Sequence, residues 1–230
     1  MKKTFLLSCL MLAAMPVMAA YTGRVYVDKN KNGVFDPGEK TWAGIKVSDG
    51  LNVVETAADG SFTLPGHERE RFIFITTPSG YKTFNRHYHK IEEKQSGYDF
   101  GLMPYSGRIR KDGSHKYIHI ADTEIFNTEN HEDWVNNVRD YARNEQAAFI
   151  IHTGDICYEK GLKAHIKLMN TENMDCPVFY CIGNHDLVKG KYGEELFESI
   201  YGPVYYSFDA GNVHYIVTPM PGDRKSTRLN

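Results

Sequence analysis

Two glycine-led motifs, each placed directly after an apolar run, constrain the fold of this chain most strongly. Gly154-Asp155 follows Ala147–His152, and Gly183-Asn184-His185-Asp186 follows Pro177–Ile182. Such runs predict buried strands, whereas Gly-Asp or Gly-Asn alone would indicate only a turn. Because both motifs stand at predicted strand exits and predicted helices follow them, they indicate parallel strands that deliver polar side chains to one sheet edge.

The sequence around these motifs repeats the alternation of strand and helix from residue 116 to 222. Trp134, Val138 and Tyr141 recur at helical spacing, and Thr128 or Asn130 could cap that helix. The other predicted elements are strands over 117–121, 147–152 and 177–182, helices over 162–169 and 192–200, and a hairpin over 205–217. The fold class predicted for this part is α/β, with helices covering a parallel sheet and the hairpin starting a second one.

The first half of the chain has a different pattern, which predicts short strands and many turns. Asp-Gly and Pro-Gly pairs separate five predicted strands, at 23–27, 44–47, 52–56, 61–64 and 71–75. Short strands at this spacing predict a small β-sandwich over residues 21–103. The polar, glycine-containing stretch 104–115 is predicted to be a linker.

Residues 1–20 have the composition of a bacterial-type secretory signal peptide. Lys2 and Lys3 precede the apolar run 5–14, and small residues lead to a predicted cleavage after Ala19 or Ala20. The apolar run is shorter than the ~20 residues that a spanning helix needs, so no transmembrane anchor is predicted. We therefore expect an exported protein, periplasmic or extracellular.

Charge and cysteine content narrow the choice of partners. The formal net charge is −2, and about −4 without the two leader lysines, which gives no indication of nucleic-acid binding. Cys157, Cys176 and Cys181 remain after processing, so at least one thiol is free. Cys176 and Cys181 bracket an extended segment too long for a disulfide, and we expect buried, unreactive side chains.

The polar residues at the three strand exits are suited to binding hard metal ions. Asp122, Asp155 and Asn184 each follow a predicted strand and should meet at one sheet edge. Two divalent ions held ~3.5–4 Å apart can activate water for attack on phosphorus. His185 would stand over the leaving oxygen as proton donor, and Asp186 would orient its ring. Metal-assisted hydrolysis of a phosphate ester is the chemistry that these residues predict.

Three motifs resemble those of the calcineurin-like metallophosphoesterases: Ala121-Asp122-Thr123-Glu124, Gly154-Asp155-Ile156 and Gly183-Asn184-His185-Asp186. The resemblance spans residues 116–222 and implies an α/β/β/α-type domain acting on a phosphate monoester or diester. It implies two divalent ions, Mn, Fe, Zn or Mg. Carried over, Asp122 becomes a ligand of one metal, Asp155 the bridge and Asn184 a ligand of the other, with His185 near the leaving group.

Two departures from the family pattern bear on the site. Glu124 stands where the family usually has a histidine, so it either ligates through oxygen or lies outside the coordination sphere. The lone His and the Gly-His-x-His motif that complete both metals do not follow His214, whose mid-strand position predicts a structural role. Residues 223–230 are polar and aperiodic, either a native flexible terminus or, as we expect, a non-native or disordered tail on a fragment with an incomplete domain. We expect such a fragment to be inactive or weakly active.

A twelve-residue loop in the first half, from Asp28 to Glu39, follows the spacing of calcium loops. The predicted ligands carry oxygen at the required places: Asp28, Asn30, Asn32, Val34 through its carbonyl, Asp36 and Glu39. Strand-like residues precede the loop, so it resembles the calcium loops of β-sandwich modules in bacterial surface proteins. A plain Asn/Gly-rich turn is the alternative.

Two functional readings follow from the sequence. The first is an exported metal-dependent phosphoesterase whose β-sandwich positions it or closes over its cleft. The alternative is a non-catalytic extracellular binding or scaffold protein with a degenerate phosphoesterase domain. Arg86, His87 and His89 could reach a phosphate across a domain interface, or could form a solvated loop.

Overall fold

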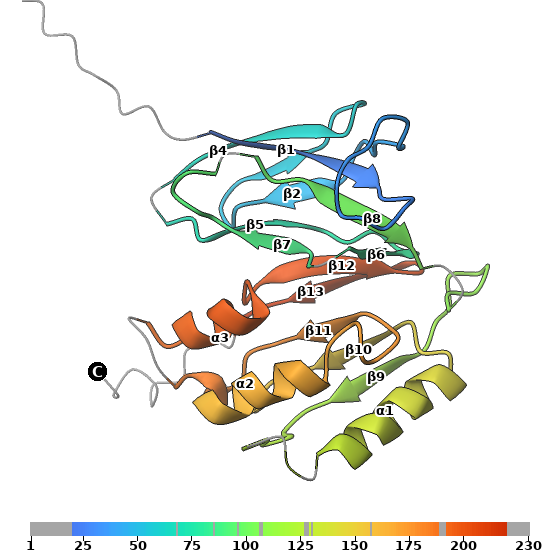
Figure 1. Ribbon diagram of the computed structural model, residues 1–230, viewed down its shortest axis with the longest axis vertical. Coiled ribbons are helices and arrows are strands. Elements are labelled where there is room, and N and C mark those ends of the chain that lie inside the picture. The colour runs from blue at the N-terminus through green and yellow to red at the C-terminus, as the bar shows by residue number, and fades with distance from the viewer. Residues whose placement is uncertain are drawn as a thin grey trace, which may run out of the picture.

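The computed structural model describes residues 20–219, except 68, 85, 96, 106–107, 127–128, 130, 157 and 189–191. Most of the predicted signal peptide and the predicted tail at 223–230 lie outside the described residues. A strand-rich first half is followed by a half that alternates strands and helices (Figure 1). The mixed α/β fold class with a strand-rich N-terminal region is therefore confirmed.

The first half, here called the two-sheet region, contains eight strands among its described residues. They are β1 (Ala20–Val27), β2 (Lys46–Ser48), β3 (Val53–Glu55), β4 (Ser61–Pro65), β5 (Phe72–Ile75), β6 (Tyr81–Thr83), β7 (Tyr88–Lys90) and β8 (Phe100–Pro104). One sheet has the order β4-β1-β8-β6 and the other β3-β2-β5-β7. Apolar side chains of both sheets form one core, for example Val25 and Leu64 with Val47 and Ile73. The sheets therefore face each other across a common interior.

The second half, here called the α/β region, starts with a three-stranded parallel sheet. Its elements are β9 (Tyr117–Ile120), α1 (Glu132–Asn144), β10 (Phe149–His152), α2 (Glu159–Leu168), β11 (Val178–Tyr180), the 3-10 turn η1 (Asn184–Asp186), α3 (Glu195–Tyr201), β12 (Tyr206–Ala210) and β13 (Val213–Val217). The sheet order is β11-β10-β9. Strand β10 begins with Phe149 and Ile150, which point to opposite faces as neighbours in a strand do.

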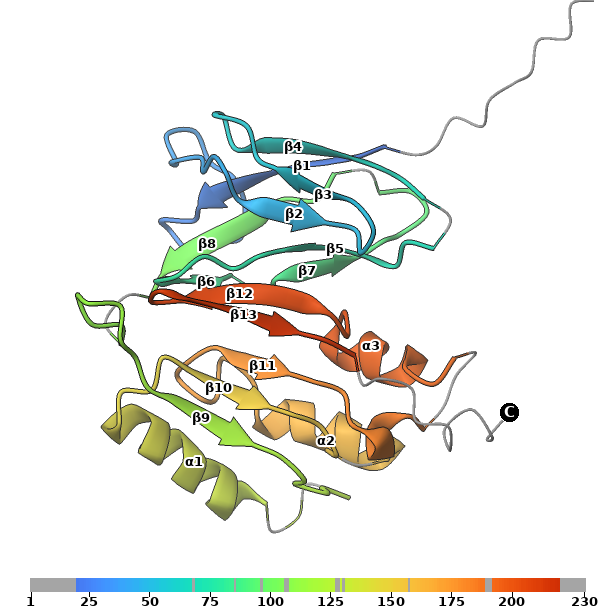
Figure 2. The ribbon, with the colours of Figure 1, turned by 180° about the vertical axis from the view of Figure 1, so that it is seen from behind.

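These two faces are covered by different layers. Ile150 packs with Val135 and Ala142 of α1, whereas Phe149 packs with Phe208 and Val217 of the β12–β13 hairpin. In both views the order of layers is helices α1 and α2, the β9–β11 sheet, the hairpin and then the two-sheet region (Figure 2). The hairpin thus lies between the parallel sheet and the first half of the chain.

The hairpin joins the two halves through backbone and side-chain contacts. Phe208 forms a parallel bridge with Thr77, and the backbone N–H of Asp209 donates to the carbonyl of Thr77 over 2.8 Å. Phe72, Phe74 and Tyr88 of the two-sheet region belong to the same apolar cluster as Phe149 and Phe208. This shared core fixes the two halves against each other.

Several helix limits differ from the sequence expectation. Helix α1 begins after His131, whose side chain makes no capping bond, while Thr128 and Asn130 lie outside the described residues. Helix α2 begins at Glu159, before the predicted start at 162, and α3 begins at Glu195. None of the helices in the described ranges is long and apolar enough to span a membrane.

Part of the predicted linker is an ordered turn. Ile109 and His115 form an antiparallel bridge. Arg108 donates to the carbonyl of Ala147 over 3.0 Å and to the Asp175 carboxylate over 2.9 Å. This turn therefore docks onto the α/β region rather than only connecting the halves.

Candidate metal centre

The exits of the three parallel strands bring the predicted metal-binding side chains to one place. Asp122 follows β9, Asp155 follows β10 and Asn184 follows β11 in the first turn after the strand. All three line a single cavity of about 300 Å³ at the carboxyl edge of the sheet. Two carboxylates and an amide oxygen are a donor set that suits hard divalent ions.

The glycines of the two motifs allow the strand exits to touch. A Cβ on Gly154 would lie 2.4 Å from the backbone nitrogen of Gly183, and a Cβ on Gly183 would lie 2.2 Å from that of Asp155. Gly154 also has φ +97°, a left-handed conformation that glycine adopts without steric cost. Both loops can therefore pack backbone against backbone, which sets the spacing of Asp155 and Asn184.

The backbone at the site holds non-glycine residues in the left-handed region. Asp122 has φ 54°, Glu124 φ 43° and Asp155 φ 52°. Hydrogen bonds fix this geometry, from the N–H of Asp122 to the carbonyl of Gly154 and from that of Glu124 to the carbonyl of Asp155. Such residues cost of order 1–3 kcal/mol each and cluster at functional sites.

The His185-Asp186 pair is held by bonds to the neighbouring loops. The backbone N–H of His185 donates to Asp155 Oδ1 over 3.0 Å, and buried Asp186 accepts the backbone N–H of Gly183 over 2.8 Å. His185 Nδ1 lies 3.2 Å from Glu124 Oε1. Glu124 is thus the carboxylate that the structure places beside the His185 ring, and the pairing of His185 with Asp186 stays a prediction.

Two aromatic side chains lie on the outer side of His185. The ring of Tyr158 is nearly parallel to the His185 ring, with 6.1 Å between centroids, and Phe126 lies 6.1 Å from Tyr158. Both side chains are about half exposed. They form an exposed aromatic edge next to the predicted proton donor.

Sequence reasoning missed the buried histidine that supports the first motif. His152 is fully buried, and its Nε2 lies 2.9 Å from the Thr123 hydroxyl, between Asp122 and Glu124. Burial lowers the pKa of His152 to about 4, so the ring is neutral at physiological pH. The only hint in the sequence was its place at the end of the β10 run.

The closest grouping of possible metal-ligand atoms lies elsewhere in the described residues. Among the described residues, three His, Cys, Asp or Glu ligand atoms come within 4.8 Å of one another only at Asp49, His67 and Glu70. Both oxygens of Asp49 already accept hydrogen bonds, from Leu51 and Asn52. His67 Nδ1 accepts the N–H of Arg69 over 3.1 Å, which leaves the ring proton on Nε2, facing Asp49. These hydrogen bonds indicate a turn held together by its own side chains rather than a metal site.

The predicted calcium loop folds back on itself. The buried Asp28 carboxylate accepts the backbone N–H groups of Asn32 and Gly33. The side-chain amides of Asn30 and Asn32 both donate to Asp36 Oδ2, over 2.7 and 2.8 Å, and lower the pKa of Asp36. Glu39 closes the loop by accepting the backbone N–H of Lys29 and of Asp36. Hydrogen bonds therefore link five of the predicted ligands within the loop, and Val34 donates its N–H to Asn32. The carboxylate oxygens of Asp28, Asp36 and Glu39 do not all lie within 4.8 Å of one another.

The remaining predicted residues lie away from this centre. His214 Nδ1 lies 2.6 Å from Asp209 Oδ1 in a cross-strand pair of the hairpin. Cys176 and Cys181 are free thiols whose pKa burial raises to about 11, and Cys157 lies outside the described residues. His89 bonds to the carbonyl of Asp99 inside the two-sheet region.

Comparisons with known families cover both halves of the chain. Residues 115–223 match a family model described as calcineurin-like phosphoesterase. Residues 29–105 match a second model, described as the N terminal of calcineurin-like phosphoesterase. A search of the curated proteins gives no match.

Proposed function

Because the chain belongs to the calcineurin-like phosphoesterase family, we propose that it hydrolyses phosphate monoesters or diesters at a dinuclear metal centre. The observation that carries this proposal is the shared cavity at the carboxyl edge of the parallel sheet, lined by Asp122, Asp155 and Asn184. Active sites of open α/β sheets lie at this edge.

Each of these side chains has a role that its position supports. Asp122 and Asn184 would each hold one ion, and Asp155, which follows the central strand, would lie between the ions. Divalent ions of Mn, Fe, Zn or Mg would supply Lewis-acid activation of water and of the phosphoryl oxygens. The bond from the His185 backbone to Asp155 Oδ1 holds the bridging carboxylate in a defined orientation.

His185 is the proposed proton donor to the leaving oxygen. Its Nδ1 faces Glu124, which leaves Nε2 as the atom that would deliver the proton. This proximity, which does not meet hydrogen-bond geometry, supports a position for Glu124 beside His185. Asp186 would then position His185 indirectly, because its carboxylate accepts the backbone N–H of Gly183 and stabilises the turn that contains His185.

We also propose export and a calcium-stabilised loop in the two-sheet region. The predicted leader at 1–20 supports residence in the periplasm or outside the cell. Hydrogen bonds fold the Asp28–Glu39 loop back on itself, and three of its predicted ligands are carboxylates, which supports a hard cation with oxygen ligands. A calcium ion there would stabilise the loop far from the phosphoesterase site.

A non-catalytic binding or scaffold protein is the second candidate. The observation in its favour is that, in the described part of the chain, no histidine lines the cavity with Asp122, Asp155 and Asn184. A centre that lacks sufficient ligands would bind metal weakly and turn over slowly. Metal content and activity must therefore be measured on the same samples.

The test compares the wild-type chain with Asp155→Asn and Asp28→Asn. Each is equilibrated with Mn²⁺ and millimolar Ca²⁺, and mass spectrometry of the elements then counts both metals. We expect about two Mn²⁺ ions per chain in the wild type. Asp155→Asn should lose Mn²⁺ and, by more than about a hundredfold, hydrolysis of nitrophenyl phosphates, but keep calcium. Asp28→Asn should lose calcium but keep Mn²⁺ and hydrolysis.

Each variant is the control for the other, since both replace a carboxylate by its amide. Wild-type protein that binds Mn²⁺ but hydrolyses neither the monoester nor the diester would support the scaffold reading. Full activity and metal content in Asp155→Asn would contradict the bridging role. Calcium retained by Asp28→Asn would contradict calcium binding at this loop and favour a plain turn.

A further inference from the structure

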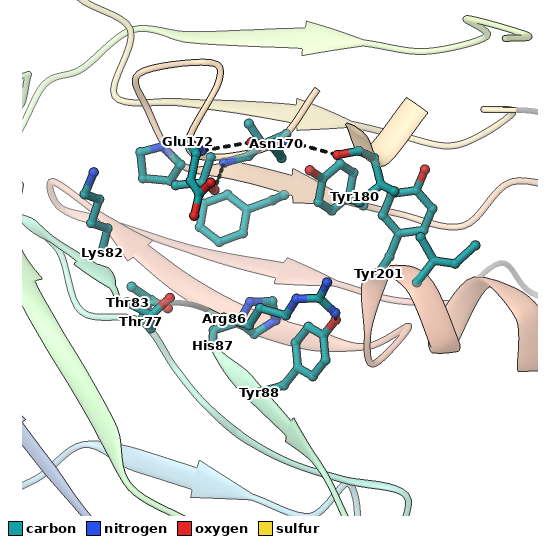
Figure 3. Close-up of a pocket in the computed structure, with 16 residues that line it drawn as sticks. Thr77, Lys82, Thr83, Arg86, His87, Tyr88, Asn170, Glu172, Tyr180 and Tyr201 are labelled. Carbon is teal, nitrogen blue, oxygen red and sulfur yellow. Dashed lines mark hydrogen bonds between the residues drawn. The ribbon is translucent and has the colours of Figure 1, made fainter. Parts of the chain in front are cut away.

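A second cavity, separate from the metal centre, lies where the two halves meet. It has a volume of about 270 Å³, close to the lower limit of ~300–1,000 Å³ for small-molecule sites. Residues of β6 and of the β6–β7 connection form one wall, and α2, β11 and α3 contribute the other (Figure 3). It shares no lining residue with the cavity at Asp122 and Asp155.

The wall from the two-sheet region carries two positive charges. Lys82 lies at one end, and the Arg86 guanidinium extends between Tyr88 and Tyr201 (Figure 3). Arg86 donates to the Tyr88 hydroxyl, and Lys82 Nζ lies 5.5 Å from the ring centre of Tyr105. Across the described ranges, neither cation is within salt-bridge distance of a carboxylate.

The same wall offers a buried nitrogen without a partner. His87 lines the cavity, and its Nε2 is buried with no hydrogen-bond partner among the described residues. Burial and then the charge of Arg86 lower the pKa of His87 to about 3, so the ring is uncharged at physiological pH. A buried polar atom left unpaired is destabilising, and a ligand that hydrogen-bonds to it removes that cost.

The opposite wall is aromatic, and the hydroxyl groups of its tyrosines are engaged within the protein. The Tyr180 hydroxyl donates to the carbonyl of Met169, and the Tyr201 hydroxyl donates to that of Leu162. Asn170 is also engaged, since its amide donates to Ile166 and its oxygen accepts the N–H of Glu172. Glu172, the one acidic residue of the lining, is solvent-exposed.

A cavity with cations on one wall and aromatic side chains on the other fits a ligand that has an anionic group and an apolar ring. We propose that this cavity binds a small organic anion, with its oxyanion at Arg86 and His87 and a planar ring on Tyr180 and Tyr201. Lys82 supplies a second positive charge at the other end. Because residues of both halves form the walls, the ligand would also bind the halves together.

The test measures calorimetric binding of benzylphosphonate, which has an oxyanion and a ring but no ester bond to hydrolyse. The full chain is kept in a chelator, so the metal centre cannot contribute. We expect saturable binding by the wild type and at least tenfold weaker binding by Arg86→Ala. Lys82→Ala should weaken binding a few-fold. The matched control is Lys90→Ala, an exposed lysine on β7 outside the cavity.

Ligand controls test the oxyanion contact and the ring contact separately. Inorganic phosphate and cyclohexylmethylphosphonate carry the oxyanion without the planar ring, and both should bind more weakly than benzylphosphonate. Equal affinity for all three would overturn the ring contact. No saturable binding by the wild type, or equal binding by a folded Arg86→Ala protein, would overturn the site. Because the metal centre is empty in chelator, none of these outcomes depends on phosphoesterase activity.

Discussion

At the scale of single residues, the site depends on two glycines that let two loops meet. Gly183 has an ordinary extended backbone, so its requirement is space rather than conformation. A methyl group there would lie 2.2 Å from both the backbone nitrogen and Oδ1 of Asp155. The atoms that would have to move are those of the proposed bridging ligand.

We therefore predict that Gly183→Ala reduces Mn²⁺ content and phosphate-ester hydrolysis by at least about tenfold. The fold should persist, because the loop can shift at the open edge of the sheet. The measurements are metal content, initial rates and circular dichroism. Gly97→Ala is the control, since a Cβ there meets nothing within 4 Å. Unchanged metal content in Gly183→Ala would mean that loop contact does not set the ligand spacing.

The sequence indicates these residues because their signals are local. An apolar run followed by Gly-Asp or Gly-Asn indicates a strand and its exit without knowledge of the rest of the fold. The left-handed backbone of Asp122, Glu124 and Asp155 has no such signal, since it arises from hydrogen bonds between separate loops. The contact of Glu124 with His185 joins residues far apart in the chain and was missed for the same reason.

At the scale of elements, an ion pair ties helix α3 to the two-sheet region. Arg71, just before β5, donates from Nε and Nη2 to the two oxygens of Glu198 over 2.8 and 2.6 Å. Glu198 is 3% exposed and also accepts the Tyr192 hydroxyl. Helix α3 follows the motif that carries His185, so this pair connects the two-sheet region to the segment beside the site.

We predict that Arg71→Met lowers the free energy of unfolding by about 2–3 kcal/mol, because it leaves the Glu198 carboxylate buried with fewer donors. Arg71 is partly exposed, which keeps the loss near the lower end expected for a buried pair. Urea denaturation of wild type and variant measures the difference. Lys163→Met, which breaks an exposed pair within α2, should cost less than about 0.5 kcal/mol. Equal losses of unfolding free energy in the two variants would contradict a larger stabilising effect of the Arg71–Glu198 pair.

Element prediction succeeded where apolar residues run continuously or alternate clearly, and it missed three strands of the two-sheet region. The strands of the parallel sheet and the β12–β13 hairpin were found, because their apolar runs are continuous or alternate clearly. β6, β7 and β8 were missed. β6 and β7 have three residues each and gain their strand geometry from pairing with β8 and β5. The pairing of distant segments leaves little trace in such short sequences.

At the scale of the whole molecule, buried neutral histidines make stability depend on pH. His165 is fully buried beside His152 and Tyr201, and its pKa lies well below the usual value because of burial and the nearby His152. The pKa of His152 is lowered to about 4 and that of His87 to about 3. These three rings lie in the α/β region and at the junction of the halves, so their protonation concerns the shared structure.

All three folded-state pKa values lie below the unfolded value of ~6.5, which fixes the sign of the effect. Above that pH both states are neutral at these groups and stability does not change. As pH falls below it, only the unfolded chain takes up protons, so the free energy of unfolding decreases. Each histidine contributes up to about 1.4 kcal/mol per pH unit, or about 4 kcal/mol for three, until the folded pKa is passed.

Urea unfolding between about pH 7.5 and pH 5 tests this prediction, with Trp42 reporting on the two-sheet region and Trp134 on helix α1. Because both halves share the cluster around Phe74 and Phe208, we expect both probes to give one midpoint that falls with pH. His165→Gln should reduce the slope by about a third. Stability that stays constant between these pH values would contradict the neutral, buried state of these rings, since a group that titrates equally in both states cannot alter the folding equilibrium.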